Sequence, residues 1–313
     1  MGADDRDIRI ISLFGRAVSV AALALCAVAG HAQEIEPRAY SNIPQGLNFA
    51  VVGLAHSVGG LASDPTLPLD DAHLKIDATL LGFAHAIQLF GQSGKVDVVL
   101  PYFWLHGNAE FAGDPVQRRV TGFGDPRLRF SINLHGAPAL ALKDFSTYRQ
   151  DTIIGLSVQV GLPLGQYDPT RVVNLGTNRW TVKPEIGASK AAGPWTFEVA
   201  AAANLFGDND DFFGGRLREQ DPIYSVQGGV IYGFKRGVWI ALHGTYYTGG
   251  RTTVNGVQGD DLQQNSLIGF TAAAPLSRQN SLKFYAATGL VTRIGTDADV
   301  FSLAFQHRWG GGL

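Results

Sequence analysis

The sequence predicts an all-β protein: a transmembrane, antiparallel, up-and-down β-barrel of about 12 strands, with long extracellular loops and short periplasmic turns. Three observations lead to this prediction. Polar and apolar residues alternate along most of the chain after Gln33, the alternating segments are long, and the connections between them are alternately short and long. Successive side chains of a strand point to opposite faces. A closed barrel of such strands places lipid outside and water inside.

The first 32 residues have the features of an export signal. Arg6, Arg9 and Arg16 supply positive charge, and an apolar run at 17–29 follows. This run is too short to span a membrane as a helix. Small residues at the usual spacing place the cleavage site after Ala32, so we predict a signal peptide over residues 1–32.

A lipoprotein signal is the alternative, because the run contains Cys26. Leu25 precedes that cysteine where a small residue is expected, which argues against it. Removing the signal removes the only cysteine, and this excludes a disulfide scaffold, a thiolate metal site and a cysteine nucleophile. We then expect a short periplasmic N-terminal segment at 33–46 and the outer-membrane barrel at 47–313.

The composition fits a transmembrane barrel. The net charge of -2 is too balanced for a nucleic-acid partner or a polybasic membrane anchor. The mean hydropathy of +0.05 is low for a helical membrane protein, but it suits a barrel whose inner face is polar.

Twelve segments have the strand pattern. The clearest is 127–135, where Leu128, Phe130 and Leu134 alternate with polar residues. A tilted strand needs about nine to eleven residues to cross a bilayer, and nearly all the segments reach that length. They are 47–60, 73–89, 95–112, 119–135, 151–162, 179–190, 194–206, 221–234, 237–250, 263–275, 280–294 and 298–309.

The connections have a rhythm that orients the barrel. Tight turns rich in turn-forming residues stand at 91–94, 191–193, 235–237 and 277–280, and longer polar loops at 61–72, 163–178, 207–220 and 251–262. Short periplasmic turns and long outer loops are typical of bacterial barrels. Residues 136–150 break the rhythm. They form either a long periplasmic segment or, through 139–145, another short strand.

Aromatic residues stand near the expected membrane interfaces. Trp180, Trp195 and Trp239 open predicted strands and Trp309 closes one, whereas Trp104 lies deeper. Such rings favour the headgroup level. Bulky aromatics also cap sheets in general, but four of five at strand ends favour the interface. The final aromatic-ended strand is what the outer-membrane assembly machinery is expected to recognise.

Charged residues on the polar faces are the candidate lumen-lining residues, because an Arg or Lys facing lipid near the midplane would cost about 2–4 kcal/mol. Both signs occur, which favours cross-strand ion pairs. The alternatives are a salt-bridged interior that props the wall and a selectivity ring. The candidates are Lys75, Asp77, Lys95, Asp97, Arg127, Arg129, Lys183, Glu185, Glu198, Lys283 and Arg308.

Several stretches together resemble one family. They are Gly122-Phe123-Gly124-Asp125-Pro126, Leu162-Pro163-Leu164-Gly165-Gln166-Tyr167-Asp168, Asn174-Leu175-Gly176-Thr177-Asn178-Arg179-Trp180, Lys183-Pro184-Glu185-Ile186-Gly187 and Arg308-Trp309-Gly310. The chain resembles the "MetA-pathway of phenol degradation" transporters over most of its mature length. The resemblance implies an outer-membrane barrel of a Gram-negative bacterium, associated with the degradation of aromatic compounds. From the residues alone, structural punctuation or an inward-folding loop are both open for these motifs.

We therefore expect an outer-membrane channel or transporter for passive uptake of small molecules, aromatic or hydrophobic compounds among them. Its expected partners are that solute, outer-membrane lipid and lipopolysaccharide, and the assembly machinery. The histidines have no metal-ligand spacing, and no cofactor motif is present. A lipid-hydrolysing barrel enzyme using His307 is the alternative, disfavoured because no serine stands near it. A structural barrel is a third option.

Overall fold

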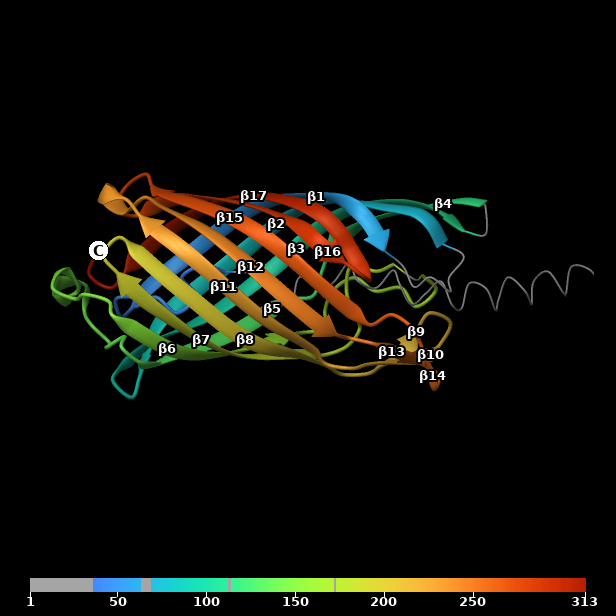
Figure 1. Cartoon of the computed structure of the whole chain (residues 1–313), viewed down its shortest axis with the longest axis horizontal. Coiled ribbons are helices and arrows are strands. Elements are labelled where there is room, and N and C mark those ends of the chain that lie inside the picture. Colours follow the sequence, from blue (N-terminus) through green and yellow to red (C-terminus); the bar gives the residue numbers. More distant parts are fainter. Residues whose placement is uncertain (1–35, 63–68, 112–113, 172) are drawn as a thin grey trace, which may run out of the picture.

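The structure, a computed structural model, describes residues 36–62, 69–111, 114–171 and 173–313. Its main sheet closes into an antiparallel barrel, because β1 pairs with both β2 and β17 and β2 also pairs with β3 (Figure 1). The sheet has 13 segments. Two of them, β4 and β5, both pair with β3 and are halves of one interrupted strand, so the barrel has twelve strands as predicted.

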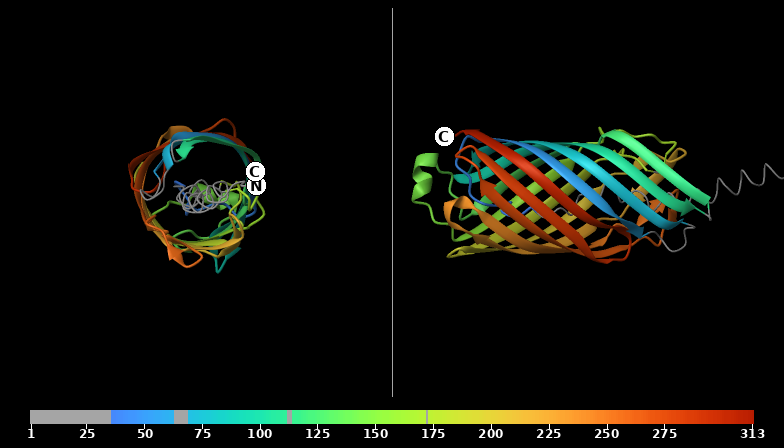
Figure 2. Two further views of the ribbon diagram at one scale, coloured as in Figure 1. Left: turned by 90° about the vertical axis from the view of Figure 1, so that its right-hand side faces the viewer. Right: turned by 90° about the horizontal axis from the view of Figure 1, so that it is seen from above.

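The barrel strands have the following bounds: β1 Leu47–Ala62, β2 Leu69–Leu89, β3 Gln92–Phe111, β4 Asp114–Phe123, β5 Arg127–His135, β6 Thr152–Gly161, β7 Thr181–Ala192, β8 Trp195–Phe206, β11 Ile223–Gly233, β12 Trp239–Gly249, β15 Gln263–Pro275, β16 Asn280–Thr292 and β17 Gly295–Gly310. Viewed along its axis, the barrel is round, with loop segments inside its outline (Figure 2).

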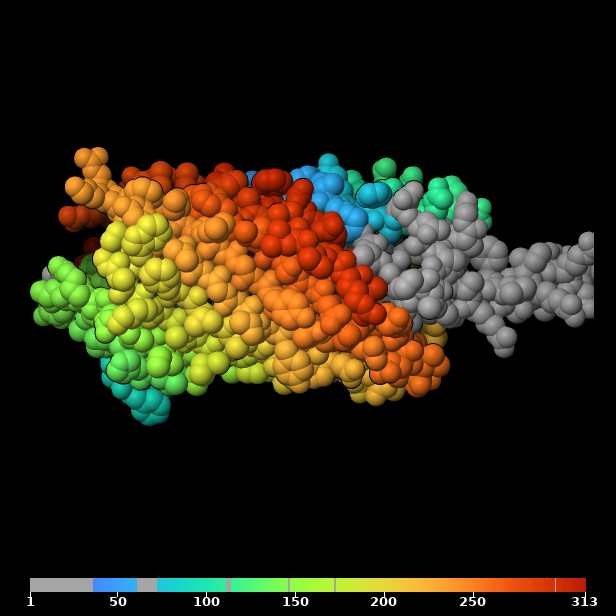
Figure 3. All heavy atoms as spheres, viewed as in Figure 1, coloured from blue at the N-terminus to red at the C-terminus, as the bar shows by residue number. Residues whose placement is uncertain are grey.

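The predicted alternation sets the two faces of the wall. In β5, Leu128 and Leu134 are 43% and 52% exposed, whereas the intervening Asn133 is 5% exposed. Most other strands repeat this pattern, which gives the barrel an apolar outer belt. Among the exposed belt residues are Val52, Leu54, Leu81, Phe83, Val98, Leu156, Val158, Ile186, Phe197, Val199, Val226, Val230, Leu242, Phe270, Phe284, Phe301, Leu303 and Phe305. Figure 3 shows the densely packed outer wall over β11 to β16.

The short turns gather at one end, which we call the periplasmic end. Residues 136–150 lie there too, and the predicted alternative of a strand at 139–145 is wrong. This segment instead contains a short 3-10 helix, η3 Leu142–Ser146, and Pro138 forms only an isolated bridge with Gln92. Gly136 and Pro138 disfavour continuous pairing. The interruption of rhythm is therefore a long connection and not a thirteenth strand.

At the opposite, extracellular end, a second sheet joins two of the long loops. It consists of β9 Asn209–Phe212, β10 Arg216–Gln220, β13 Thr252–Val254 and β14 Val257–Gln258. At the periplasmic end, another short 3-10 helix, η4 Lys235–Gly237, forms a tight turn. Among the residues that the structure describes, no helix is both long and apolar enough to span a membrane.

Candidate functional site

The described N-terminal residues lie inside the barrel. Glu36 contacts β3 and β5, Arg38 stacks over a ring of β12, and Tyr40 reaches β6 and β7. Because β3 and β12 lie six strands apart in a twelve-stranded barrel, residues 36–40 cross the lumen. We call residues 36–40 the plug. The chain then leaves through the periplasmic end, where the Gly46 N–H donates to the Ala86 carbonyl at 3.3 Å.

An ion cluster holds the first residue of the plug. Arg129 Nε donates to both carboxylate oxygens of Asp97 at 3.2 Å, and Lys95 Nζ lies 3.6 Å from Asp97. Glu36 adds a second carboxylate, bonded by Arg129 Nη2 and 3.9 Å from Lys95 Nζ. Asp97 and Arg129 are register partners on neighbouring strands, so alternation directs both inward. The charged wall residues thus pair with one another, and Arg129 and Lys95 still have N–H groups that can bind Glu36 of the plug.

A second contact holds the Tyr40 side chain. Its hydroxyl donates to Glu185 Oε1 at 2.9 Å and lies 3.3 Å from the Ser157 hydroxyl. Glu185 in turn lies 3.2 Å from Lys183 Nζ on the same strand. The ring occupies a slot made by two register-paired glycines, Gly155 of β6 and Gly187 of β7. The missing side chains at these glycines therefore create the space in which Tyr40 packs.

The glycine slot leads to a testable expectation. A Cβ at Gly187 would lie 2.3 Å from Tyr40 Cε2, and one at Gly155 would lie 2.2 Å from Tyr40 Cδ1. We expect Gly187→Ala to expel the ring and weaken the plug by about 1–3 kcal/mol, because packing and the hydroxyl contacts are lost together. Trypsin should then cleave after Arg38 roughly tenfold faster, as plug opening becomes more frequent.

Gly228→Ala is the matched control for this expectation. Gly228 is also a strand glycine, but its added Cβ would meet nothing closer than the Glu198 carbonyl at 3.8 Å. This substitution should leave the cleavage rate unchanged. Equal rates for Gly187→Ala and Gly228→Ala would show that Tyr40 does not retain the plug.

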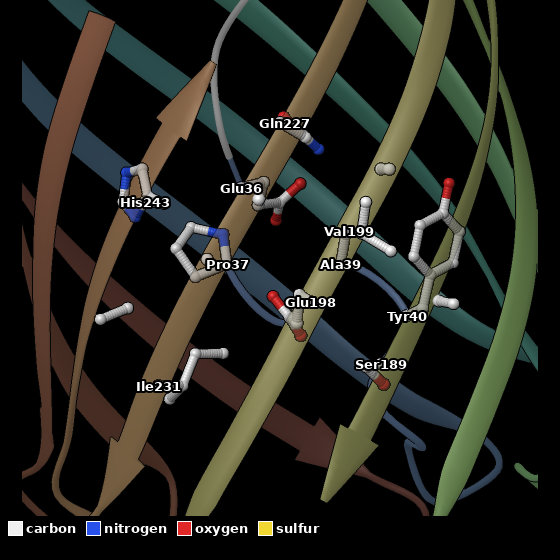
Figure 4. Close-up of a pocket in the computed structure, with 15 residues that line it drawn as sticks. Glu36, Pro37, Ala39, Tyr40, Ser189, Glu198, Val199, Gln227, Ile231 and His243 are labelled. Carbon is white, nitrogen blue, oxygen red and sulfur yellow. The ribbon is translucent and has the colours of Figure 1, made fainter.

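Beside the plug is a cavity between the plug and the inner faces of β7, β8, β11 and β12 (Figure 4). Pro37 and Ile231 supply apolar lining, and Glu198 accepts a 2.9 Å hydrogen bond from the Arg38 N–H. His243 is 4% exposed and stacks on Tyr285 at 5.9 Å. Within the described residues, neither ring nitrogen of His243 has a hydrogen-bond partner. The cavity therefore combines apolar lining with one carboxylate, Glu198, that a solute could bind.

Two of the five tryptophans differ from the positions that the sequence predicts. Trp180, Trp195 and Trp309 are exposed. Trp239 is instead on the inner phase of β12, and the Arg38 guanidinium lies 5.6 Å from its ring centroid. The interface position predicted for Trp239 is thus incorrect, because the cation–π contact with the plug gives this ring an inward partner. Trp104, expected deeper, faces outward and is 40% exposed.

Most of the charged residues expected in the lumen share the inner phase of their strands. These are Lys95, Asp97, Arg127, Arg129, Lys183, Glu185, Glu198, Lys283 and Arg308. The structure gathers Lys95, Asp97 and Arg129 under Glu36, and Lys183 and Glu185 near Tyr40. Arg308 is at the periplasmic rim, where its Nε donates to the Arg278 carbonyl at 2.7 Å.

Lys75 and Asp77 differ from that expectation and lie on the outer face. They share the strand phase of Leu81 and Phe83. Asp77 Oδ1 lies 2.6 Å from Nδ1 of His56, which also faces outward. The physical reason is an inversion of polarity near the extracellular end. There the inner face is apolar, because Ile76 and Leu105 pack against Val173 and Leu175 of the loop 163–178. The polar phase consequently points outward, above the apolar belt.

Comparison with known proteins identifies the family. A model of the "MetA-pathway of phenol degradation" family matches residues 55–293. The chain belongs to this family. Among solved structures, it is similar to the COG4313 outer membrane channel from Pseudomonas putida F1, with 23% identity, a TM-score of 0.76, and coverage of 88% of this chain and 100% of that chain.

A second solved structure is more distant. The transport unit of the autotransporter AIDA-I from Escherichia coli has 9% identity and a TM-score of 0.50, with coverage of 90% of this chain and 96% of that chain. Among curated proteins, none matches. These likenesses establish the fold of an outer-membrane barrel, as the sequence predicted.

The motifs by which the chain resembles the MetA-pathway family tether an extracellular loop. Asp125, in the break between β4 and β5, accepts hydrogen bonds from the Gly165 N–H at 2.8 Å and from the Thr177 N–H and hydroxyl at 2.7 and 2.6 Å. A Cβ at Gly165 would lie 2.7 Å from the Gly124 carbonyl carbon, and one at Gly176 would lie 2.8 Å from Gly165. Glycines at these positions thus allow backbone to pack on backbone.

Within the same loop, Asp168 organises the turn. The Thr170 hydroxyl and backbone N–H donate to its carboxylate at 2.6 and 2.9 Å, and these bonds lower the pKa of Asp168. The Asn174 side chain accepts a hydrogen bond from the Asp168 N–H and donates one to the Asp168 carbonyl. These motifs therefore interrupt or end strands, and they also fold a loop into the extracellular mouth of the barrel.

No local sequence pattern indicated that the plug, Trp239 or His243 belongs to the lumen site. A run such as Glu36-Pro37-Arg38-Ala39-Tyr40 has no strand period, so only its charged and aromatic content could have signalled a binding role. In the described part of the chain, no cluster of three or more His, Cys, Asp or Glu side chains is placed to hold a metal ion.

Proposed function

We propose that this protein is an outer-membrane channel through which small molecules pass down their gradient, aromatic and hydrophobic compounds among them. One observation carries the proposal: a polar, charged inner wall is crossed by a plug that only non-covalent contacts retain. Family membership and the fold of the COG4313 channel support it. The plug is then the element that sets how far the lumen is open.

The proposal includes the targeting of the chain. Residues 1–32 act as the signal peptide, residues 33–46 form the N-terminal segment that includes the plug, and residues 47–313 form the barrel. The assembly machinery inserts the barrel into the outer membrane, where its apolar belt contacts lipid and lipopolysaccharide.

The cavity beside the plug supports the solute class. Pro37 and Ile231 offer apolar surface, and His243, whose ring stacks on Tyr285, offers aromatic surface. The Glu198 carboxylate provides a polar group that could accept a hydrogen bond from a hydroxyl. A ring that carries a hydroxyl group matches this combination, since binding sites pair apolar lining with a few placed polar groups.

Planar-bilayer recording and liposome swelling test the proposal. We expect discrete conductance steps, and faster swelling in 4-hydroxybenzoate than in gluconate, because only the aromatic anion matches the cavity. A folded barrel that shows neither conductance nor swelling, even after release of the plug, would refute the channel function. Equal swelling in the two solutes would refute the aromatic preference alone.

We further propose that the barrel has no lipid-hydrolysing activity. His307 faces outward, but its Nδ1 lies 2.8 Å from Asn280 Oδ1 and its register partners are Ala50 and Asn280. An activated serine needs its base within hydrogen-bond reach. The refolded protein should therefore release no fatty acid from phospholipid vesicles, with or without His307→Ala.

A further inference from the structure

A row of basic side chains crosses the outer face of the barrel near its extracellular end. Lys75 of β2 is the register partner of His106 of β3, and His106 is the register partner of Arg119 of β4. All three residues are exposed. On their respective strands they alternate in step with the outward-facing Phe83, Val98 and Phe123, so the three side chains point away from the lumen.

Aromatic residues immediately below this row mark a membrane interface. Tyr102 makes edge-to-face contacts with Trp104 at 4.8 Å and with Phe123 at 4.9 Å. Trp104 is two residues before His106 on the same face, and it is 40% exposed although it lies mid-strand. Aromatic girdles of this kind lie at the headgroup level of barrels. The basic row is therefore one step above the apolar belt, at the height of the outer-leaflet headgroups.

We propose that Lys75, His106 and Arg119 form a binding site for the phosphate groups of lipid A. Neighbouring strands are about 4.8 Å apart, so adjacent members of the row can bond one phosphate together. A guanidinium and an ammonium form charge-assisted hydrogen bonds with phosphate oxygens, and a histidine ring adds a donor. The ligand is a lipid because the site is on the lipid-facing wall and directly above the aromatic girdle.

The surrounding charges favour an external anion. Of the outward acids on this face, Asp77 is engaged by His56 at 2.6 Å, and the exposed Glu110 lies four residues beyond His106 on β3. In the described part of the chain, no carboxylate forms an ion pair with any of the three basic residues. Around the barrel the sign reverses, since exposed Asp297 and Asp299 lie on β17 beyond β1. The positive row is thus a local feature of the β2, β3 and β4 face.

The test compares lipid binding by the detergent-purified barrel. Native mass spectrometry would titrate hexa-acylated lipid A against wild type and against Lys75→Gln/His106→Gln/Arg119→Gln. We expect the dissociation constant to rise about tenfold or more in the triple variant, because each exposed charge contact contributes modestly. Lipid A stripped of both phosphates should bind the two proteins equally, whereas excess inorganic phosphate should compete only for wild type.

The matched control removes three exposed cations from the periplasmic turns, Lys235→Gln/Arg236→Gln/Arg278→Gln. It should bind lipid A as wild type does. Heat-modifiable gel mobility would verify that each variant is folded, and single-channel conductance should be unchanged in all of them. The inference is overturned if both triple variants lose binding equally, or if the row variant binds phosphorylated lipid A as tightly as wild type. Neither result bears on the channel function.

Discussion

Glu36→Gln combined with Tyr40→Phe should convert a mostly closed channel into a mostly open one. The first change removes the carboxylate that Arg129 and Lys95 hold, and the second removes the hydroxyl that donates to Glu185. Glu36 is 38% exposed, so its loss is worth about 1–2 kcal/mol, and the Tyr40 hydrogen bond adds about 1 kcal/mol. Together they shift the ratio of open to closed states by roughly a hundredfold.

The wall is expected to survive both substitutions. Asp97 remains bonded to Arg129 at 3.2 Å and close to Lys95 at 3.6 Å, so no wall cation is left without a carboxylate. Removing Arg129 instead would leave Asp97 and Glu36 to share the single cation Lys95, and it would confuse plug release with damage to the barrel. For this reason the plug side of the contact is the informative place to mutate.

Single-channel open probability measures the effect directly, and the rate of trypsin cleavage after Arg38 measures it independently. Lys190→Gln is the control, because it breaks an ion pair with Asp151 in a periplasmic turn where the two side chains are 56% and 77% exposed. The difference between wild type and the plug variant should shrink at high salt, since salt screens the Glu36 contacts. An unchanged open probability would show that residues 36–40 do not obstruct conduction.

The sequence could predict the wall because strand alternation is a local property. In β5, Leu128 and Phe130 face lipid while Arg129 faces the lumen, as the period-two pattern requires. The same pattern put Asp97 and Glu185, whose neighbours on either side are apolar, on the inner phase of their strands, and both have that phase in β3 and β7. The number of strands followed from the lengths of these segments and from the turn residues between them.

The sequence could not predict contacts that depend on segments far apart in the chain. Lys75 and Asp77 were assigned to the lumen because polar residues face inward at the bilayer midplane. Near the mouth the rule inverts, since Leu175, about a hundred residues further on, returns inside the barrel and packs on Ile76 and Leu105. Nothing in the local period of β2 distinguishes its two halves.

The plug was missed for a related reason. Tyr40 packs into a slot formed by Gly155 and Gly187, and a glycine in a strand indicates only that some close approach is tolerated. Which segment approaches is fixed by tertiary contacts at a separation of over a hundred residues. The 33–46 segment was therefore expected in the periplasm, whereas its described residues from Glu36 to Tyr40 lie in the lumen.

Asp125→Ala should release the loop 163–178 from the extracellular mouth. One carboxylate accepts three hydrogen bonds, from the Gly165 N–H and from the N–H and hydroxyl of Thr177. Hydrogen bonds to a charged group are each worth about 1.5–3 kcal/mol, so their joint loss destabilises the docked loop by about 3–5 kcal/mol. The Gly165 and Thr177 amides should then exchange at least roughly a hundredfold faster with deuterated water.

Asp168→Ala separates loss of the tether from general softening of the loop. Its carboxylate bonds Thr170 within the turn and has no bond to Asp125, Gly165 or Thr177 in the described structure. This variant should speed exchange at Thr170 and leave the Gly165 and Thr177 amides protected. If both variants deprotect the same amides equally, the loop unfolds as one unit and Asp125 has no special role. If only Asp125→Ala does so, the loop is held at the mouth by the strand break between β4 and β5, and the extracellular opening is set by that break independently of the plug.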